Sequence, residues 1–328
     1  MNRLQKTIIC LLVSWLSCTS IVWAQQFPQL TQYMNNRLSY NPAYAGSKED
    51  VNLEAAVRMQ WVGIEGSPMT QVVGVHLPVA GIRSGIGLNI VNDLLGAERN
   101  TGLMLSYAYQ AKLGARSKLS IGLSVGGIQK SLDGGKLRSS GGDYTGGVDH
   151  QDDLIPVGVA SGIAPDAGFG LYLESDKLTL GLSAQHLLEP AIGFDTNSGG
   201  TYDISFNRHF FFFGSYEMEI GNIVLHPSLL LKSDLVKMQG EVSAIAAFGG
   251  IFKGGLAFRG LEPNSFDAVS ILAGVDMSQQ FALMYSYDFI LSNLNNASSG
   301  SHELSVHYKF QHILPTRKGK AIYTPRFL

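Results

Sequence analysis

Cysteine, basic charge and long apolar runs are all scarce in this sequence. Its two cysteines, Cys10 and Cys18, both lie in the first 24 residues, so the rest of the chain can form no disulfide and no thiolate metal site. Beyond Arg3 and Lys6, 22 basic residues face 26 acidic ones, and this formal net charge of −4 attracts no nucleic acid. No stretch after residue 24 reaches the roughly 18 apolar residues that a transmembrane helix needs.

The first 24 residues have the pattern of a secretory signal peptide. A basic start is followed by an apolar stretch over residues 7–17, and Val22-Trp23-Ala24 offers a cleavage site. We therefore predict a signal peptide over residues 1–24 and a mature chain that begins near Gln25. A lipoprotein anchored at Cys18 is the alternative, although the residues before it fit a lipobox poorly.

The mature chain consists of segments of about ten residues in which apolar and small or polar residues alternate. In one of them, Leu119, Ile121, Leu123 and Val125 alternate with Ser120, Gly122, Ser124 and Gly126. Alternate residues of a strand point to opposite faces, and such segments, separated by turns, are typical of outer-membrane β-barrels. A soluble β protein is the alternative, but it should carry a hydrophobic core instead of so many inward-facing glycines.

The alternation predicts an all-β fold, a transmembrane antiparallel β-barrel of the outer membrane over residues 51–311. A lead-in or plug segment over residues 25–50 precedes the barrel, and a tail over residues 312–328 follows it. An even number of strands brings both ends of the barrel to one side of the membrane. We expect fourteen strands, at residues 52–62, 69–77, 85–93, 101–112, 118–128, 166–174, 177–186, 209–219, 223–232, 239–249, 252–260, 268–277, 281–289 and 302–311.

The connections between the expected strands alternate in length. Short turns such as residues 113–117 and 221–222 follow even-numbered strands, whereas most longer loops, including residues 129–165, 187–208 and 290–301, follow odd-numbered ones. Outer-membrane barrels have short periplasmic turns and long extracellular loops. We therefore expect both termini in the periplasm, and we expect the longest loop, residues 129–165, to be either a binding surface or a surface loop without a ligand.

Aromatic residues and glycines recur at particular places in the expected strands. Aromatic residues near strand ends predict girdles at the membrane interfaces. The periplasmic girdle would contain Tyr107, Tyr109, Tyr308 and Phe310, and the outer girdle would contain Phe210 to Phe213 and Tyr287. Inward-facing glycines such as Gly122 and Gly170 either curve the wall or leave the lumen open for water, loops or a lipid-like ligand.

The sequence predicts no enzymatic site, no metal site and no cofactor. Residues 122–126 match Gly-x-Ser-x-Gly, but a nucleophile elbow needs a strand, a turn and a helix, and this match lies within one strand. A membrane-embedded lipase that uses Ser124 is the enzyme alternative. His302 and Glu303 point to opposite faces of a strand. We expect a solvated acidic surface at Asp149, His150, Asp152 and Asp153. A cation site is the alternative, although the loop lacks a spaced calcium motif.

A polar and aromatic segment precedes the first strand. It contains Gln32-Tyr33-Met34 and Asn41-Pro42-Ala43-Tyr44-Ala45-Gly46, in which Asn-Pro and Ala-Gly change the chain direction and the tyrosines offer apolar anchoring. We expect this segment to pack beneath or inside the barrel as a short plug. An ordered lead-in without a partner of its own is the alternative.

These motifs carry a resemblance to a known family. With Arg58-x-Gln60-Trp61-x-Gly63, Gly66-Ser67-Pro68-x-Thr70 and Gly300-Ser301-His302-Glu303-Leu304-Ser305, the chain resembles the PorP/SprF family of the type IX secretion system. The resemblance implies an export-machine component of gliding and non-gliding Bacteroidota and not an enzyme. It also implies outer-membrane lipids, periplasmic and outer-membrane subunits of the machine, and secreted adhesin-like cargo as partners.

The candidate partner contacts come from these motifs and from the basic tail, which can dock an acidic partner or stay solvated. They are Tyr33, Asn41, Pro42, Tyr44, Arg58, Trp61, Arg317, Lys318, Lys320 and Arg326. The resemblance favours a barrel that anchors periplasmic machinery and assists export or surface attachment of cargo. A porin or ligand-selective channel, with the glycine-rich interior as its conduit, is the alternative.

Overall fold

The computed structural model describes residues 27–79, 81–196, 200–260 and 266–310. The predicted signal peptide, residues 1–24, lies outside the described residues and stays a prediction. The basic tail also lies outside them, with its four candidate residues Arg317, Lys318, Lys320 and Arg326. No helix among the described residues is long and apolar enough to cross a membrane.

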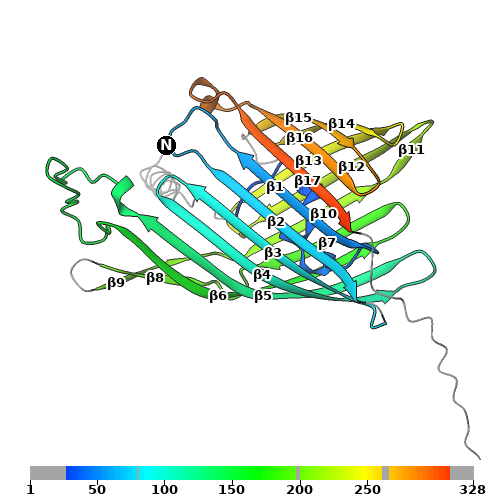
Figure 1. The fold of residues 1–328 in the computed structure, drawn as a ribbon, viewed down its shortest axis with the longest axis horizontal. Coiled ribbons are helices and arrows are strands. Elements are labelled where there is room, and N and C mark those ends of the chain that lie inside the picture. Colours follow the sequence, from blue (N-terminus) through cyan, green and yellow to red (C-terminus); the bar gives the residue numbers. More distant parts are fainter. Residues whose placement is uncertain (1–26, 80, 197–199, 261–265, 311–328) are drawn as a thin grey trace, which may run out of the picture.

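Fourteen strands form one closed antiparallel barrel, which confirms the number predicted from the alternation (Figure 1). Each strand pairs with the next around the wall, and β1 pairs with β17 to close it. The strands are β1 (Val51–Met59), β2 (Met69–Val79), β3 (Ser84–Leu95), β4 (Glu98–Lys112), β5 (Lys118–Asp133), β6 (Val159–Glu174), β7 (Leu178–Gln185), β10 (His209–Tyr216), β12 (Ile223–Ser233), β13 (Met238–Phe248), β14 (Phe252–Arg259), β15 (Ala268–Asp276), β16 (Phe281–Ile290) and β17 (Ser301–Phe310).

Three further short strands supplement the wall. β11 (Met218–Ile220) continues β10 along β12. β8 (Ala191–Asp195) and β9 (Thr201–Ser205) form a separate hairpin inside the connection between β7 and β10, where the sequence predicted only a loop. The side chains of Ile192 and Phe194 pack in an apolar cluster with Ile128 of β5, so the hairpin covers the inner face of the neighbouring wall.

The two ends of the barrel differ in their connections. Val51 pairs with Phe310, so the first and last strands begin and finish at the same end, which we call the terminal end. The connections there are short, whereas the opposite end, which we call the loop end, carries residues 134–158 and 186–208. Residues 96–97 are an exception, because they make a two-residue turn at the loop end. The assignment of the terminal end to the periplasm stays a prediction.

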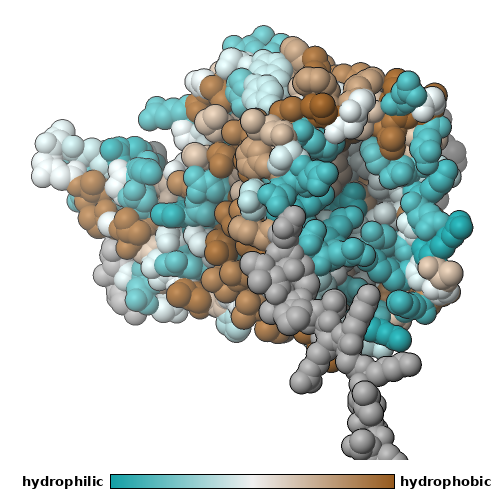
Figure 2. All heavy atoms as spheres, turned by 45° about the vertical axis from the view of Figure 1, so that its right-hand side comes forward, coloured by the Kyte–Doolittle hydropathy of each residue, from teal (hydrophilic) through white to brown (hydrophobic). Residues whose placement is uncertain are grey.

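The apolar face of the wall points outward and the polar face points inward. Leu105 and Leu123 are 56% and 58% exposed on the outside, while Ser120 and Ser305 are fully buried inside. A soluble protein would bury its apolar face, so this inverted arrangement fits a wall surrounded by lipid. Figure 2 shows hydrophobic surface along the outer wall and largely hydrophilic surface around the barrel end turned toward the viewer.

The aromatic residues divide between the two faces of the wall. Tyr107 and Tyr109 are 49% and 47% exposed on the outside, as the girdle interpretation requires. For Phe210 to Phe213 that interpretation is wrong at two positions, because Phe211 and Phe213 are buried inside the barrel. The alternation of β10 explains the error, since every second residue of the run must face the lumen.

Candidate functional site: a plug held across the lumen

Residues 27–50, which we call the plug, lie inside the barrel ahead of β1 (Figure 1). The plug contains the short helices η1 (Tyr33–Asn35), α2 (Arg37–Tyr40) and η2 (Pro42–Tyr44). Its contacts reach opposite parts of the wall: Leu38 lies against β2 and β3, and Tyr33 binds β12 and β13. The plug therefore crosses the lumen from one wall to the other.

The start of the plug is bound by ionised side chains that face the lumen. We call these side chains the charge cluster: Arg58, Lys232, Glu241, Arg259, Asp288 and Glu303. Three are basic and three are acidic, so their formal charges balance. All six are at most 6% exposed. Burial of single charges is costly, and a buried set needs close pairing and further hydrogen bonds.

Arg58 and Asp288 form a close ion pair within the charge cluster. Arg58 Nη2 lies 2.7 Å from Asp288 Oδ2, and Arg58 Nη1 lies 3.2 Å from Glu303 Oε2. Arg58 Nη1 also donates to Thr31 Oγ1 at 2.7 Å. Glu303 accepts the backbone N–H groups of Thr31 and Gln32 at 2.7 and 3.0 Å, so both of its oxygens bind the plug.

Arg259 extends the cluster across the barrel. Its Nε donates to Glu241 Oε2 at 2.8 Å, and its Nη2 donates to Thr31 Oγ1 at 2.8 Å. Gln29 then donates to Glu241 at 3.1 Å and accepts from Lys232 Nζ at 2.6 Å. Residues from six strands thus meet at a few residues of the plug and pair most of their buried polar atoms, while Arg58 Nε and Glu241 Oε1 have no hydrogen-bond partner among the described residues.

Glycines on β3, β5, β6 and β7 form a bed for the middle of the plug, which we call the glycine track: Gly85, Gly87, Gly122, Gly170 and Gly181. A Cβ atom at Gly122 would overlap the backbone of Pro42 and Ala43, and one at Gly85 would overlap Ala45 and Gly46. The glycines therefore permit close approach of the plug backbone, which is a recognised role of glycine within strands.

Asn41 uses one end of its amide within the plug and the other end to bind the wall. Its Oδ1 accepts from Ala43 N at 2.9 Å and begins η2, with Pro42 in the first helical position. Its Nδ2 donates to the carbonyl oxygens of Leu171 and Leu182 at 2.9 and 3.2 Å, on β6 and β7. The Asn-Pro pair thus shapes the turn and binds the wall at the same time.

Aromatic side chains and one guanidinium fill the space around the plug. Arg37 donates to Tyr172 OH at 2.7 Å, and its guanidinium lies 4.8 Å from the centre of the Phe213 ring. Burial raises the pKa of the Tyr40 and Tyr44 phenols well above the usual value, so both stay protonated. The Tyr44 hydroxyl then donates to Glu54 Oε1 at 3.3 Å.

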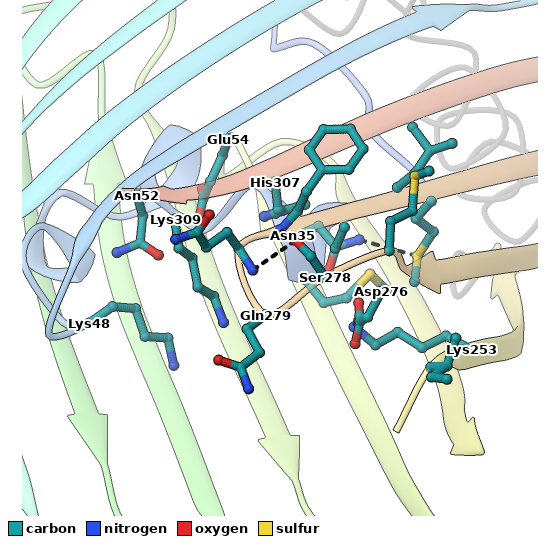
Figure 3. Close-up of a pocket in the computed structure, with 18 of the residues that line it drawn as sticks. Asn35, Lys48, Asn52, Glu54, Lys253, Asp276, Ser278, Gln279, His307 and Lys309 are labelled. Atoms are coloured by element: carbon teal, nitrogen blue, oxygen red, sulfur yellow. Dashed lines mark hydrogen bonds and ion pairs between the residues drawn. The ribbon is translucent and has the colours of Figure 1, made fainter. Parts of the chain in front are cut away.

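A cavity of about 790 Å³ opens below the plug, and we call it the vestibule (Figure 3). The plug, β1, β17 and two turns of the terminal end line it. Figure 3 shows Lys48, Gln279 and Lys309 reaching toward the same space from three of these elements. A second cavity, of about 70 Å³, lies on the other side of the plug beside Phe27 and Phe206.

The structure brings five of the sequence-predicted contact residues together in the lumen: Tyr33, Asn41, Pro42, Tyr44 and Arg58. Their contacts in this conformation are with the barrel itself, and contact with a separate protein stays a prediction. Trp61 lies apart from them, in the connection after β1, where its backbone N–H donates to Ser301 Oγ at 3.1 Å.

Sequence reasoning missed four members of the charge cluster: Lys232, Glu241, Arg259 and Asp288. The available signal was their position, because each is an ionised residue on the inward-facing side of an alternating strand. His302 and Glu303 point to opposite faces, as predicted, with His302 outside against Tyr285 and Glu303 buried.

No group of three or more His, Cys, Asp or Glu among the described residues could hold a metal ion. Ser124 lies inside β5 with a buried side chain, on no strand-to-helix turn.

Comparison with known proteins agrees with this architecture. The profile of a family described as type IX secretion system membrane protein PorP/SprF matches residues 22–308. A search of curated proteins gives no match.

Several solved structures are similar to the chain at low sequence identity. The Ralstonia pickettii toluene transporter TbuX is 10% identical with a TM-score of 0.53, over 84% of this chain and 94% of that one. A Pseudomonas aeruginosa FadL homologue is 12% identical with a TM-score of 0.47, over 87% and 95%. The Acinetobacter baumannii protein Omp33 is 6% identical with a TM-score of 0.45, over 80% and 99%. The likeness to TbuX supports an outer-membrane barrel fold alone.

Proposed function

Because this chain belongs to the PorP/SprF family of type IX secretion system membrane proteins, we propose that it serves that machine as a plugged anchor in the outer membrane. In this role the barrel holds periplasmic machinery at its terminal end and assists export or surface attachment of secreted cargo at its loop end. The lumen supports the fold and does not conduct solutes.

The plug is the observation that carries this proposal. It crosses the lumen, and its start is tied to the charge cluster by hydrogen bonds from Gln29, Thr31 and Gln32. Removing the plug would take the Thr31 and Gln32 N–H donors from Glu303 and the Gln29 donor from Glu241, and each lost hydrogen bond to a charged group costs about 1.5–3 kcal/mol. A barrel held shut at that cost is suited to anchoring other proteins.

The terminal end supports contact with periplasmic machinery. β1 begins and β17 ends there, with Phe310 as the last described residue. The sequence after Phe310 contains four Lys or Arg residues and no acidic side chain. A basic segment of this kind favours docking of an acidic surface.

The loop end supports contact with a secreted protein, because one strand edge there is open. β7 pairs with β6 only from Phe169 to Glu174, and among the described residues no strand pairs with that edge of residues 159–166. Unpaired backbone groups are not tolerated in lipid hydrocarbon, so these residues belong outside it. Val159 and Ile163 are nevertheless 70% and 75% exposed, and such apolar surface is suited to protein contact.

A deletion strain tests the proposal. We expect loss of a secreted adhesin-like cargo from the cell surface while uptake of small solutes and sensitivity to detergents stay unchanged. Expression of the intact gene should restore the cargo. Normal surface cargo in the deletion strain would contradict the proposal.

A ligand-selective channel is the second candidate, and the size of the vestibule favours it. At about 790 Å³ it lies within the range of roughly 300–1,000 Å³ that is usual for small-molecule sites. This function requires the plug to move. Solute uptake into liposomes that contain the purified protein would support it and would argue against the plugged anchor.

A further inference from the structure

We propose that the vestibule binds an acidic peptide segment of a partner protein. This inference rests on the proposed anchoring function and identifies the chemistry of the partner at the terminal end. The vestibule is open at that end and closed at the other by the plug residues Met34, Arg37 and Tyr44. An extended segment can therefore enter it without any movement of the barrel.

The volume of the vestibule suits a short stretch of polypeptide. About 790 Å³ corresponds to roughly 25 water molecules at about 30 Å³ each. Its walls come from the plug, from β1 and β17, and from the turns after β13 and β15. These elements are held by strand pairing and by the plug contacts, so the cavity is preformed.

Positive charge predominates in the vestibule. Arg37, Lys48, Lys253 and Lys309 line it, against the two carboxylates of Glu54 and Asp276. Asp276 and Lys253 neutralise each other, because Asp276 Oδ1 lies 2.6 Å from Lys253 Nζ, which leaves Arg37, Lys48 and Lys309 against Glu54. A cleft lined by one sign of charge between low-dielectric walls concentrates the field and attracts the opposite charge.

Lys48 has only a weak partner among the carboxylates. Its Nζ lies 3.7 Å from Glu174, which binds Lys118 more closely at 3.0 Å. Burial lowers the pKa of Lys48, and a carboxylate beside this amine would oppose that shift. Lys309, on β17, reaches toward the same space (Figure 3).

Glu54 favours a peptide over a simple anion. The residue is 5% exposed, and its Oε2 has no hydrogen-bond partner among the described residues. An oxygen this buried is out of a ligand's reach, but the negative charge of Glu54 in the vestibule wall disfavours a simple anion more than a peptide, whose backbone N–H groups can face that charge. A segment with Asp or Glu side chains and free backbone N–H groups satisfies both the lysines and Glu54.

The chain's own tail is a poor occupant. Its charged side chains are Arg317, Lys318, Lys320 and Arg326, all basic. Like charges disfavour its binding beside Lys48 and Lys309.

Binding of a fluorescent peptide rich in Asp and Glu to the purified full-length protein in detergent tests the proposal. We expect saturable binding that weakens as salt is raised. The double variant Lys48→Glu/Lys309→Glu should bind about tenfold more weakly, because two attractive contacts become repulsive. The control Lys177→Glu changes an exposed lysine in another turn of the terminal end and should leave the affinity unchanged. Unchanged mobility of the folded barrel on a semi-native gel establishes that the variants fold.

Three results would overturn the proposal: no saturable binding, equal weakening by Lys177→Glu, or full competition by inorganic phosphate at the peptide's own concentration. The last result would indicate a simple anion site. The deletion strain separates this inference from the anchoring function. If the peptide binds but cargo stays at the surface in the deletion strain, the anchoring function fails and the site stands.

Discussion

Arg58 and Glu303 face each other directly across the seam between the first and last strands of the barrel, with Arg58 Nη1 3.2 Å from Glu303 Oε2. Glu303 also accepts the backbone N–H groups of Thr31 and Gln32. One carboxylate thus binds both the closing strand pair and the plug. Closure of the wall and docking of the plug therefore depend on the same bonds.

Replacing Arg58 with Ala should destabilise the protein strongly. Asp288 and Glu303 would lose their shared cation, and breaking such a buried pair costs about 3–5 kcal/mol. Urea unfolding in detergent, followed by gel mobility, measures the change. Arg116→Ala is the control, because its side chain is 81% exposed and its pair with Asp176 contributes at most about 1 kcal/mol. Equal effects of the two variants would contradict the role of the charge cluster.

Replacing Gly122 with Val should displace the plug from the glycine track. The added side chain would overlap the backbone at Pro42 and Ala43, and overpacking of this kind costs about 1–3 kcal/mol. Displacement should make a cysteine at position 39 react faster with a thiol label in a Ser39→Cys background. Ser39 is only 9% exposed, and the chain has no other cysteine after residue 18. Gly102→Val should leave labelling slow, since a Cβ there meets no atom within 4 Å.

Asn41→Asp should destabilise the protein more than Asn41→Ala. Alanine loses the cap of η2 and the donors to Leu171 and Leu182, which together are worth about 3 kcal/mol. Aspartate keeps the cap but places a buried negative charge against two carbonyl oxygens. Thermal unfolding of both variants measures the order. Asn295→Ala, on the exposed helix η4 (Asn293–Asn296), should stay within about 0.5 kcal/mol of the parent.

Deleting residues 27–46 should convert the barrel into a conducting channel. The deletion removes the part of the plug that spans the lumen from the charge cluster to the glycine track. Planar-bilayer recordings should show low conductance for the intact protein and a clear increase for the deletion variant. Conductance of the intact protein at the level of the deletion variant would mean that the plug does not close the lumen.

Much of the wall could be predicted from the sequence, because period-two alternation directly reflects a lipid-facing side and a lumen-facing side. The fourteen strands and most short turns follow from it. The alternation did not lead us to predict the β8–β9 hairpin, although Ile192 and Phe194 alternate with smaller residues before a Ser-Gly-Gly turn signal. Its strands are only five residues long, which is too short for a barrel wall.

The interior was harder to predict, because the meaning of an inward residue depends on what fills the lumen. The sequence showed glycines at inward positions but not that Gly122 approaches Pro42 and Ala43. It likewise placed Arg58 in a motif, while its partner Asp288 lies 230 residues away. Contacts of such separation arise only when the barrel closes, and no local pattern encodes them.

The charge cluster includes residues from both ends of the chain, so it is complete only after the last strands have been made. Thr31 and Arg58 are translated early, whereas Asp288 and Glu303 arrive with β16 and β17, the last strands to be made. A barrel that stalls before its last hairpin inserts would therefore carry a plug with no carboxylates to hold Thr31. The plug of such a barrel would keep its contacts with the glycine track but lack the bonds of Thr31 to Asp288 and Glu303. The start of the plug is therefore fully bound only after the last two strands are in place.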